Sequence, residues 1–131
     1  MKHVWLVDDD RIFLAITSKF LCQYEGDFSV SLYEKPKEAL QKIAEGTLPD
    51  LLFLDINMPG MDGWAFLEAL GSLADVGQMP DIFMLTSSID PADVELANQI
   101  PLVKGFLEKP LTPEKLIQTG FFSHLSQDKT P

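Results

Sequence analysis

The sequence has one cysteine, no hydrophobic run long enough to cross a membrane, and half as many basic as acidic residues. Cys22 has no partner for an internal disulfide, and it stands in an apolar helical stretch where we expect a small buried side chain. The start, Met1-Lys2-His3, passes directly into a short apolar run without a hydrophobic leader. These absences predict a cytoplasmic protein with no membrane contact.

The charge balance narrows the range of partners. The chain has 10 basic and 20 acidic residues, a net charge of -10, which repels DNA, RNA and anionic lipid. We therefore expect proteins, metal ions and small groups as partners, and no nucleic acid. With 131 residues and 46% hydrophobic content, the chain fits one compact domain. We expect this domain at residues 1–125, followed by a short C-terminal tail at residues 126–131.

Five short apolar segments alternate with five amphipathic ones. The apolar segments predict strands at residues 4–7, 28–33, 50–56, 82–85 and 105–107. Capping residues, prolines and glycines predict the helices between and after them: from Asp10 to Gly26, 36–46, from after Gly63 to Leu73, from Pro91 to about Ile100, and from Pro113 to Leu125. This alternation predicts an α/β protein with a flavodoxin-like (βα)5 fold, a doubly wound parallel sheet of strand order 2-1-3-4-5.

Apolar stripes on the helices indicate which side chains face the sheet. The stripe of the first helix is Ile12, Phe13, Ile16, Phe20 and Tyr24, that of the third is Phe66, Leu67, Leu70 and Leu73, and that of the last is Leu116, Ile117, Gly120, Phe121 and Leu125. Because Gly120 lies on its stripe, it indicates close packing against the sheet rather than the end of a helix.

Polar side chains stand where the predicted strands end. Asp8 and Asp9 follow the first strand, Asp55 the third, Thr86 the fourth and Lys109 the fifth. The carboxyl edge of an open α/β sheet is its binding edge, and this strand order makes the first and third strands neighbours. The three acids are therefore expected to share one pocket.

The three acids of such a pocket carry charges of the same sign. Carboxylates a few ångströms apart repel one another unless a cation neutralises them. Oxygen ligands with no histidine or cysteine nearby favour a hard ion such as Mg²⁺. Lys109 would add a second positive charge and Thr86 a hydroxyl donor. A carboxylate nucleophile with a metal, an ammonium and a hydroxyl suits phosphoryl transfer.

Four motifs carry a resemblance to a known family. They occur in order along the whole chain: Val7-Asp8-Asp9-Asp10, Leu54-Asp55-Ile56-Asn57-Met58-Pro59 with Asp62-Gly63, Leu85-Thr86-Ser87, and Phe106-Leu107-Glu108-Lys109-Pro110. Together they resemble the receiver domain of response regulators in two-component signal transduction systems.

The resemblance implies a chemical role for each residue of the pocket. Asp55 would be the phosphoacceptor, taking its phosphoryl group from a histidine kinase or phosphotransfer protein. Asp9, Asp55 and the backbone carbonyl of Asn57 would ligate Mg²⁺, and Asp8 would act through bound water. Lys109 would pair with the phosphoryl oxygens.

The resemblance also implies a switch. Thr86 would move toward the phosphate and Phe106 would change rotamer, although a core aromatic is an equally good interpretation of Phe106. The face made by the fourth helix, fifth strand and fifth helix would then change and control a downstream protein target, as a monomer or a phosphorylation-dependent dimer. A cis peptide bond would precede Pro110.

Three other functions compete with this interpretation. In phosphohydrolases of the haloacid-dehalogenase type, a second Asp follows the nucleophile by two residues, but Asn57 stands there. A flavodoxin-like cofactor binder would need hydroxyl and glycine donors after the first strand, where this chain has carboxylates. A scaffold that is never phosphorylated would be expected to lose some pocket residues. We therefore expect no enzyme activity beyond self-phosphorylation and slow autodephosphorylation.

Overall fold

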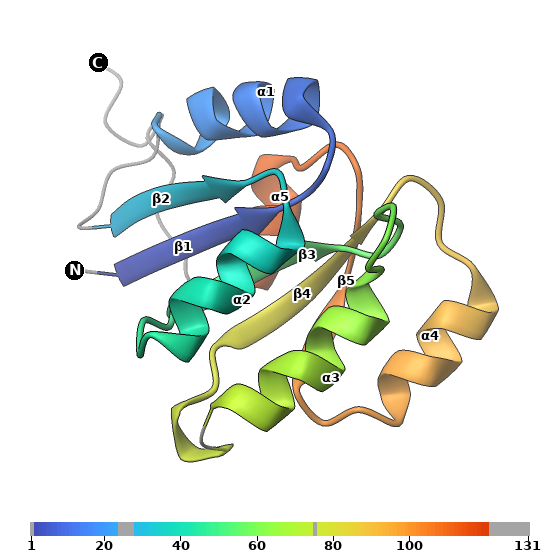
Figure 1. Ribbon diagram of the computed structural model, residues 1–131. Coiled ribbons are helices and arrows are strands. Elements are labelled where there is room, and N and C mark those ends of the chain that lie inside the picture. The colour runs from blue at the N-terminus through green and yellow to red at the C-terminus, as the bar shows by residue number, and fades with distance from the viewer. Residues whose placement is uncertain (1, 24–27, 75, 121–131) are drawn as a thin grey trace.

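Five parallel strands form one sheet in the computed structural model, which describes residues 2–23, 28–74 and 76–120 (Figure 1). The sheet order is β2-β1-β3-β4-β5, which confirms the predicted flavodoxin-like topology. The strands are β1 (Lys2–Val7), β2 (Phe28–Tyr33), β3 (Leu51–Asp55), β4 (Asp81–Thr86) and β5 (Val103–Glu108).

Helices cover both faces of this sheet. They are α1 (Arg11–Leu21), α2 (Pro36–Ala44), α3 (Gly63–Leu73), α4 (Pro91–Asn98) and α5 (Pro113–Gln118), with a short 3-10 helix, η1 (Val76–Gln78), before β4. Figure 1 shows α1 and α5 on one face and α2 and α3 on the other. None of the helices within the described ranges is long and apolar enough to cross a membrane.

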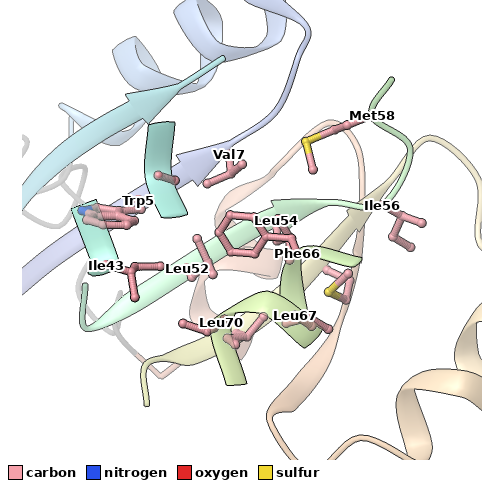
Figure 2. Close-up of a cluster of buried hydrophobic side chains, with 13 residues drawn as sticks. Trp5, Val7, Ile43, Leu52, Leu54, Ile56, Met58, Phe66, Leu67 and Leu70 are labelled. Atoms are coloured by element: carbon pink, nitrogen blue, oxygen red, sulfur yellow. The ribbon is translucent and has the colours of Figure 1, made fainter. Parts of the chain in front are cut away.

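Two apolar layers hold the helices to the sheet. Side chains of β1, β3 and β4 alternate between the layers, because successive residues of a strand point to opposite faces. Leu6 and Phe53 belong to the layer under α1 and α5. Figure 2 shows the other layer, in which Leu52 and Leu54 of β3 lie against Phe66 of α3. Residues 4–7 of β1 and all of β3 are buried, as expected of strands covered on both faces.

Side-chain caps determine where four of the helices begin. The side chains of Asp10, Asp62, Asp90 and Thr112 each accept a hydrogen bond from a backbone N–H in the first turn of the helix that follows. Asp10 directly follows Asp8 and Asp9, so the same local sequence ends β1 and starts α1.

The predicted inner face of α1 is wrong at Ile12 and Ile16, whereas Phe13 and Phe20 of the same stripe pack against the layer under α1 as expected. Ile12 and Ile16 are 72% and 63% exposed, and the buried residues are Leu14, Thr17 and Leu21. The helix is rotated toward its leucines, so that the isoleucines face solvent. It also ends at Leu21, whereas Tyr24 and Gly26 lie outside the described residues.

The predicted course of α5 is also wrong. The helix ends at Gln118, and Gly120 has a φ of +83° with no atom within 4 Å of where a Cβ would stand. A positive φ is the conformation in which glycine closes a helix. Gly120 therefore ends this segment rather than packing on the sheet. Phe121, Leu125 and the predicted tail lie outside the described residues.

Three apolar side chains expected in the core are exposed. These side chains are Cys22, Leu73, which is 44% exposed, and Ile117, which is 45% exposed. Each stands at or next to the last residue of its helix. At the end of a helix, an apolar pattern no longer guarantees that the sheet lies beneath it.

Gly63 leaves no room for a side chain between α3 and the sheet, and this close packing predicts a loss of stability on substitution. A Cβ at Gly63 would lie 2.7 Å from the carbonyl oxygen of Asp55 and 2.9 Å from Cε of Met84. We expect Gly63→Ala to lower the free energy of unfolding by about 1–3 kcal/mol in urea denaturation, because the backbone has to shift.

Gly71 of the same helix is the matched control. A Cβ there would meet nothing within 4 Å, so Gly71→Ala should raise the free energy of unfolding by about 0.5–1 kcal/mol. Equal effects of the two substitutions would contradict the assignment of Gly63 as a packing position.

Candidate functional site

The carboxyl ends of β1 and β3 bring three acids together. Val7 pairs with Leu54 in the parallel ladder, so Asp8 and Asp55 follow on neighbouring strands. Carboxylate oxygens of Asp8, Asp9 and Asp55 lie within 4.8 Å of one another. These three side chains, with Lys109, are called the acidic pocket below.

Asp8 and Asp55 are buried, whereas Asp9 is exposed. Oδ1 of Asp8 accepts a hydrogen bond from the backbone N–H of Asp10 at 2.9 Å. Oδ2 of Asp8 is buried and finds no hydrogen-bond donor in the described part of the chain beyond an ion pair with Lys109. Burying a carboxylate oxygen is costly without a compensating charge, so this oxygen favours a cation beside it.

Lys109 is the positive charge that the pocket contains. Its Nζ lies 2.6 Å from Oδ2 of Asp8 and 3.3 Å from Oδ1 of Asp55. The backbone N–H of Lys109 donates to the carbonyl of Thr86 at 2.8 Å, which holds the end of β5 beside β4. The peptide bond between Lys109 and Pro110 is cis, as the family resemblance predicted.

The electrostatics of the pocket change how two of its groups ionise. The pKa of Asp55 is raised to about 7, first by burial and then by the charge of Asp8, while the Lys109 ammonium acts in the opposite direction. Burial acts to lower the pKa of Lys109, but the hydrogen bond and charge of Asp8 and the charge of Asp55 outweigh it, and that pKa is raised. Additional positive charge would favour the ionised form of Asp55.

The Thr86 hydroxyl is already bonded within its own loop. Thr86 is buried at the end of β4, and its Oγ1 donates to the carbonyl of Ser88 at 2.7 Å. The same oxygen accepts from the backbone N–H of Ser88 at 3.2 Å. In this structure the hydroxyl therefore fastens the start of the β4–α4 loop.

Phe106 is connected through Trp64 to Asp93 of α4, and the sequence did not predict these contacts. Its ring is half-buried and meets the ring of Trp64 edge-on, with 6.4 Å between centroids. The indole N–H of Trp64 donates to Oδ1 of Asp93 on α4 at 3.3 Å. Trp64 directly follows Gly63, a motif residue, but only the tertiary fold shows that it meets Phe106 and Asp93.

Asn57 is exposed in the loop two residues beyond Asp55. Its predicted role as a backbone ligand stays a prediction. The donor set of the acidic pocket suits a hard divalent ion, because it consists of carboxylate oxygens and includes the buried Oδ2 of Asp8.

The fold and the site define a class of protein, an α/β domain with an acidic pocket at the carboxyl edge of its parallel sheet. The chain belongs to the response regulator receiver domain family, whose model matches residues 4–120. The expected family, with its place in two-component signalling, is therefore confirmed.

Relatives and solved structures agree with this assignment. The chain is 32% identical over 114 residues to the transcriptional regulatory protein FlgR of Helicobacter pylori, covering 87% of this chain and 27% of FlgR. It is 31% identical over 120 residues to protein-glutamate methylesterase/protein-glutamine glutaminase 5 of Myxococcus xanthus, covering 90% of this chain and 33% of that protein. The chemotaxis protein CheY4 of Vibrio cholerae matches with a TM-score of 0.75 and 30% identity, over 91% of this chain and 95% of that one. The chain thus spans a third or less of the two curated relatives.

The raised pKa of Asp55 predicts a pH-dependent effect on stability. In the cation-free protein, folded Asp55 keeps its proton up to a pH of about 7, whereas the unfolded chain loses it near 4. The free energy of unfolding should therefore fall as the pH rises from about 4 to 7, and the penalty is complete above that range. We expect Asp55→Asn, with a chelator present, to be more stable than the wild type by ~1–3 kcal/mol at pH 8.

Urea denaturation between pH 4.5 and 8 measures this difference. It should shrink toward the acid end, because protonated Asp55 and Asn are both neutral. Glu68→Gln, which neutralises an exposed carboxylate on α3, is the control. A stability difference between Asp55→Asn and the wild type that stays constant across the pH range would contradict the raised pKa of Asp55.

Proposed function

We propose that the protein is a phosphoacceptor switch in which Asp55 takes a phosphoryl group from a histidine kinase or phosphotransfer protein. The observation that carries the proposal is the Lys109 ammonium between two buried carboxylates, 2.6 Å from Asp8 and 3.3 Å from Asp55. An ammonium in this position can stabilise the charge of a transferring phosphoryl group. Membership of the receiver domain family supports the same chemistry.

In this reaction, a carboxylate oxygen of Asp55 attacks the phosphorus of a phosphohistidine. The new bond joins that oxygen to phosphorus, and the phosphorus–nitrogen bond breaks, leaving its electron pair on the histidine nitrogen. Asp55 has to be ionised to attack. Its pKa of about 7 means that the pocket works best with more positive charge than Lys109 alone provides.

Mg²⁺ would supply that charge. The side chains of Asp8, Asp9 and Asp55 and the backbone carbonyl of Asn57 would hold it, with Asp8 acting through bound water. When bound, the ion neutralises phosphoryl oxygens without itself being a reactant. Lys109 would then leave Asp8 and pair with the phosphoryl oxygen that remains.

Thr86 connects the phosphoryl group to the β4–α4 loop. Its hydroxyl has one proton to donate, and that proton now goes to the carbonyl of Ser88. Donation to a phosphoryl oxygen requires Thr86 to release Ser88. The loop that precedes α4 would then be free to adopt a second position.

The output face would be α4, β5 and α5. Only Ala97 of α4 is buried, so this helix is weakly held, and the bond from Trp64 to Asp93 is one of its tethers. A rotamer change of Phe106, which packs on Trp64, would alter that tether. A downstream protein target would read the altered face, with the domain as a monomer or as a phosphorylation-dependent dimer.

The names of the two curated relatives indicate different functions, since one is a transcriptional regulatory protein and the other a methylesterase. Each of those proteins is at least three times as long as the segment it shares with this chain. For this chain we propose protein binding, with no catalysis beyond gaining its own phosphoryl group and slowly losing it.

Phosphorylation with a small donor tests the proposal. Incubation with acetyl phosphate and Mg²⁺ should add one phosphoryl group to the wild type in intact-protein mass spectrometry, and a chelator should prevent it. Asp55→Asn should take no label, because an amide cannot attack. Asp50→Asn, which changes an acid at the opposite end of β3, should be labelled normally. A wild type that stays unlabelled would sink the proposal, and turnover of free acetyl phosphate at enzymatic rates would argue for a phosphohydrolase.

Trp64 offers a test of the switch. Phosphorylation should change its fluorescence, because Phe106 and Asp93 both contact the indole. The second tryptophan, Trp5, is 3% exposed in the core and should contribute little. The change should therefore persist in Trp5→Phe and disappear in Trp64→Phe. A signal that follows Trp5 instead would contradict the proposed path to α4.

A further inference from the structure

An aromatic ring lies against the ammonium of Lys109. The Nζ atom is 4.6 Å from the centroid of the Phe13 ring, while Asp8 and Asp55 bind the same atom. A cation within about 6 Å of a ring face is attracted by the negative π surface. Among the described residues, the Lys109 ammonium thus contacts two anionic side chains and one neutral ring.

The position of Phe13 is set by the acidic pocket itself. The backbone N–H of Asp10 donates to Oδ1 of Asp8 at 2.9 Å, and Oδ1 of Asp10 accepts from the backbone N–H of Phe13 at 3.1 Å. These two bonds tie the first turn of α1 to a buried carboxylate. The ring also packs against the apolar layer under α1, so it is held from both sides.

Unlike the two carboxylates, the Phe13 ring takes no part in metal binding or phosphorylation. Asp8 would be drawn from Lys109 toward a bound divalent ion and its water, and phosphorylation would take up one carboxylate oxygen of Asp55. Phe13 has no formal charge, cannot ligate the ion and cannot be phosphorylated. It is the neighbour of Lys109 that stays the same throughout the reaction.

We propose that Phe13 is a positioning residue for phosphoryl transfer, holding the Lys109 ammonium in the pocket while both carboxylates change partners. This inference rests on the proposed function of Asp55. It assigns a role to a side chain outside the four sequence motifs. The competing interpretation is that Phe13 only fills space in the core.

Substitutions that separate the π face from the volume of the side chain distinguish the two. Phe13→Leu keeps an apolar side chain, and Phe13→Tyr keeps the ring. With the full chain, Mg²⁺ and acetyl phosphate, Phe13→Leu should slow phosphorylation of Asp55 by about 2- to 30-fold, the range expected for loss of a cation–π contact. Phe13→Tyr should restore the rate to within about twofold of the wild type, because its ring attracts a cation equally well.

Three further measurements exclude a general packing defect. Phe20→Leu makes the same change about two turns further along α1 and should leave the rate unchanged. Thermal unfolding followed by circular dichroism shows whether each variant is folded under the assay conditions. The affinity for Mg²⁺, titrated without phosphodonor, should be the same in Phe13→Leu and the wild type, because the ring is not a ligand.

A double substitution tests whether the effect runs through the lysine. In a Lys109→Met background, followed over longer reaction times, Phe13→Leu should cause no further loss of rate, because no ammonium remains for the ring to hold. The inference is overturned if folded Phe13→Leu reacts like the wild type. It is equally overturned if Phe13→Tyr reacts as slowly as Phe13→Leu, or if the loss persists undiminished without Lys109.

These outcomes are separate from failure of the proposed function. A wild type that takes no label on Asp55 overturns the proposed function and, with it, a role for Phe13 in that reaction. A labelled wild type with an equally fast Phe13→Leu overturns only the positioning role.

Discussion

Two buried carboxylates side by side are the constraint on which the structure depends. Asp8 and Asp55 lie at the ends of neighbouring strands in a sheet that is covered on both faces. Both side chains are buried from water. Their repulsion is relieved by one ammonium, 2.6 Å from the first and 3.3 Å from the second. The order of strands, the ladder that holds β5 to β4 and the cap that starts α1 all serve to bring these charges together. Burial of two neighbouring carboxylates lowers stability locally, and ionisable groups perturbed in this way are concentrated at functional sites.

Much of this arrangement could be predicted because it depends on local sequence. Apolar runs that end in acids predicted β1 and β3, and capping residues such as Asp10 and Asp62 predicted the helix starts. The acidic pocket then followed from strand order alone, since parallel strands present their carboxyl ends at one edge. The sequence therefore predicts which residues share the pocket, whereas the distances between them depend on the folded chain.

The parts that could not be predicted depend on tertiary contacts. Ile12 and Leu14 are both apolar and only two residues apart on α1, and nothing local decides which faces the sheet. The positive φ of Gly120 is likewise invisible in a stripe pattern that it happens to fit. The contacts of Trp64 with Asp93, and of Phe13 with Lys109, join residues 29 and 96 positions apart, respectively. Side chains of this kind carry no motif, because their function is defined by what they touch.

The two sides of the acidic pocket are packed differently, and Gly63 marks the closely packed side. Gly63, the first residue of α3, lies so close to Asp55 that even a methyl group would meet the Asp55 carbonyl. The N–H of Gly63 donates to the carbonyl of Ile56 at 2.8 Å. On this side β3 and α3 are packed closely together, with no room for an added side chain between them. Across the pocket, by contrast, Thr86 is held by bonds within a short loop. Under the proposed function, a phosphoryl group on Asp55 would therefore displace the β4–α4 loop more easily than it would displace α3.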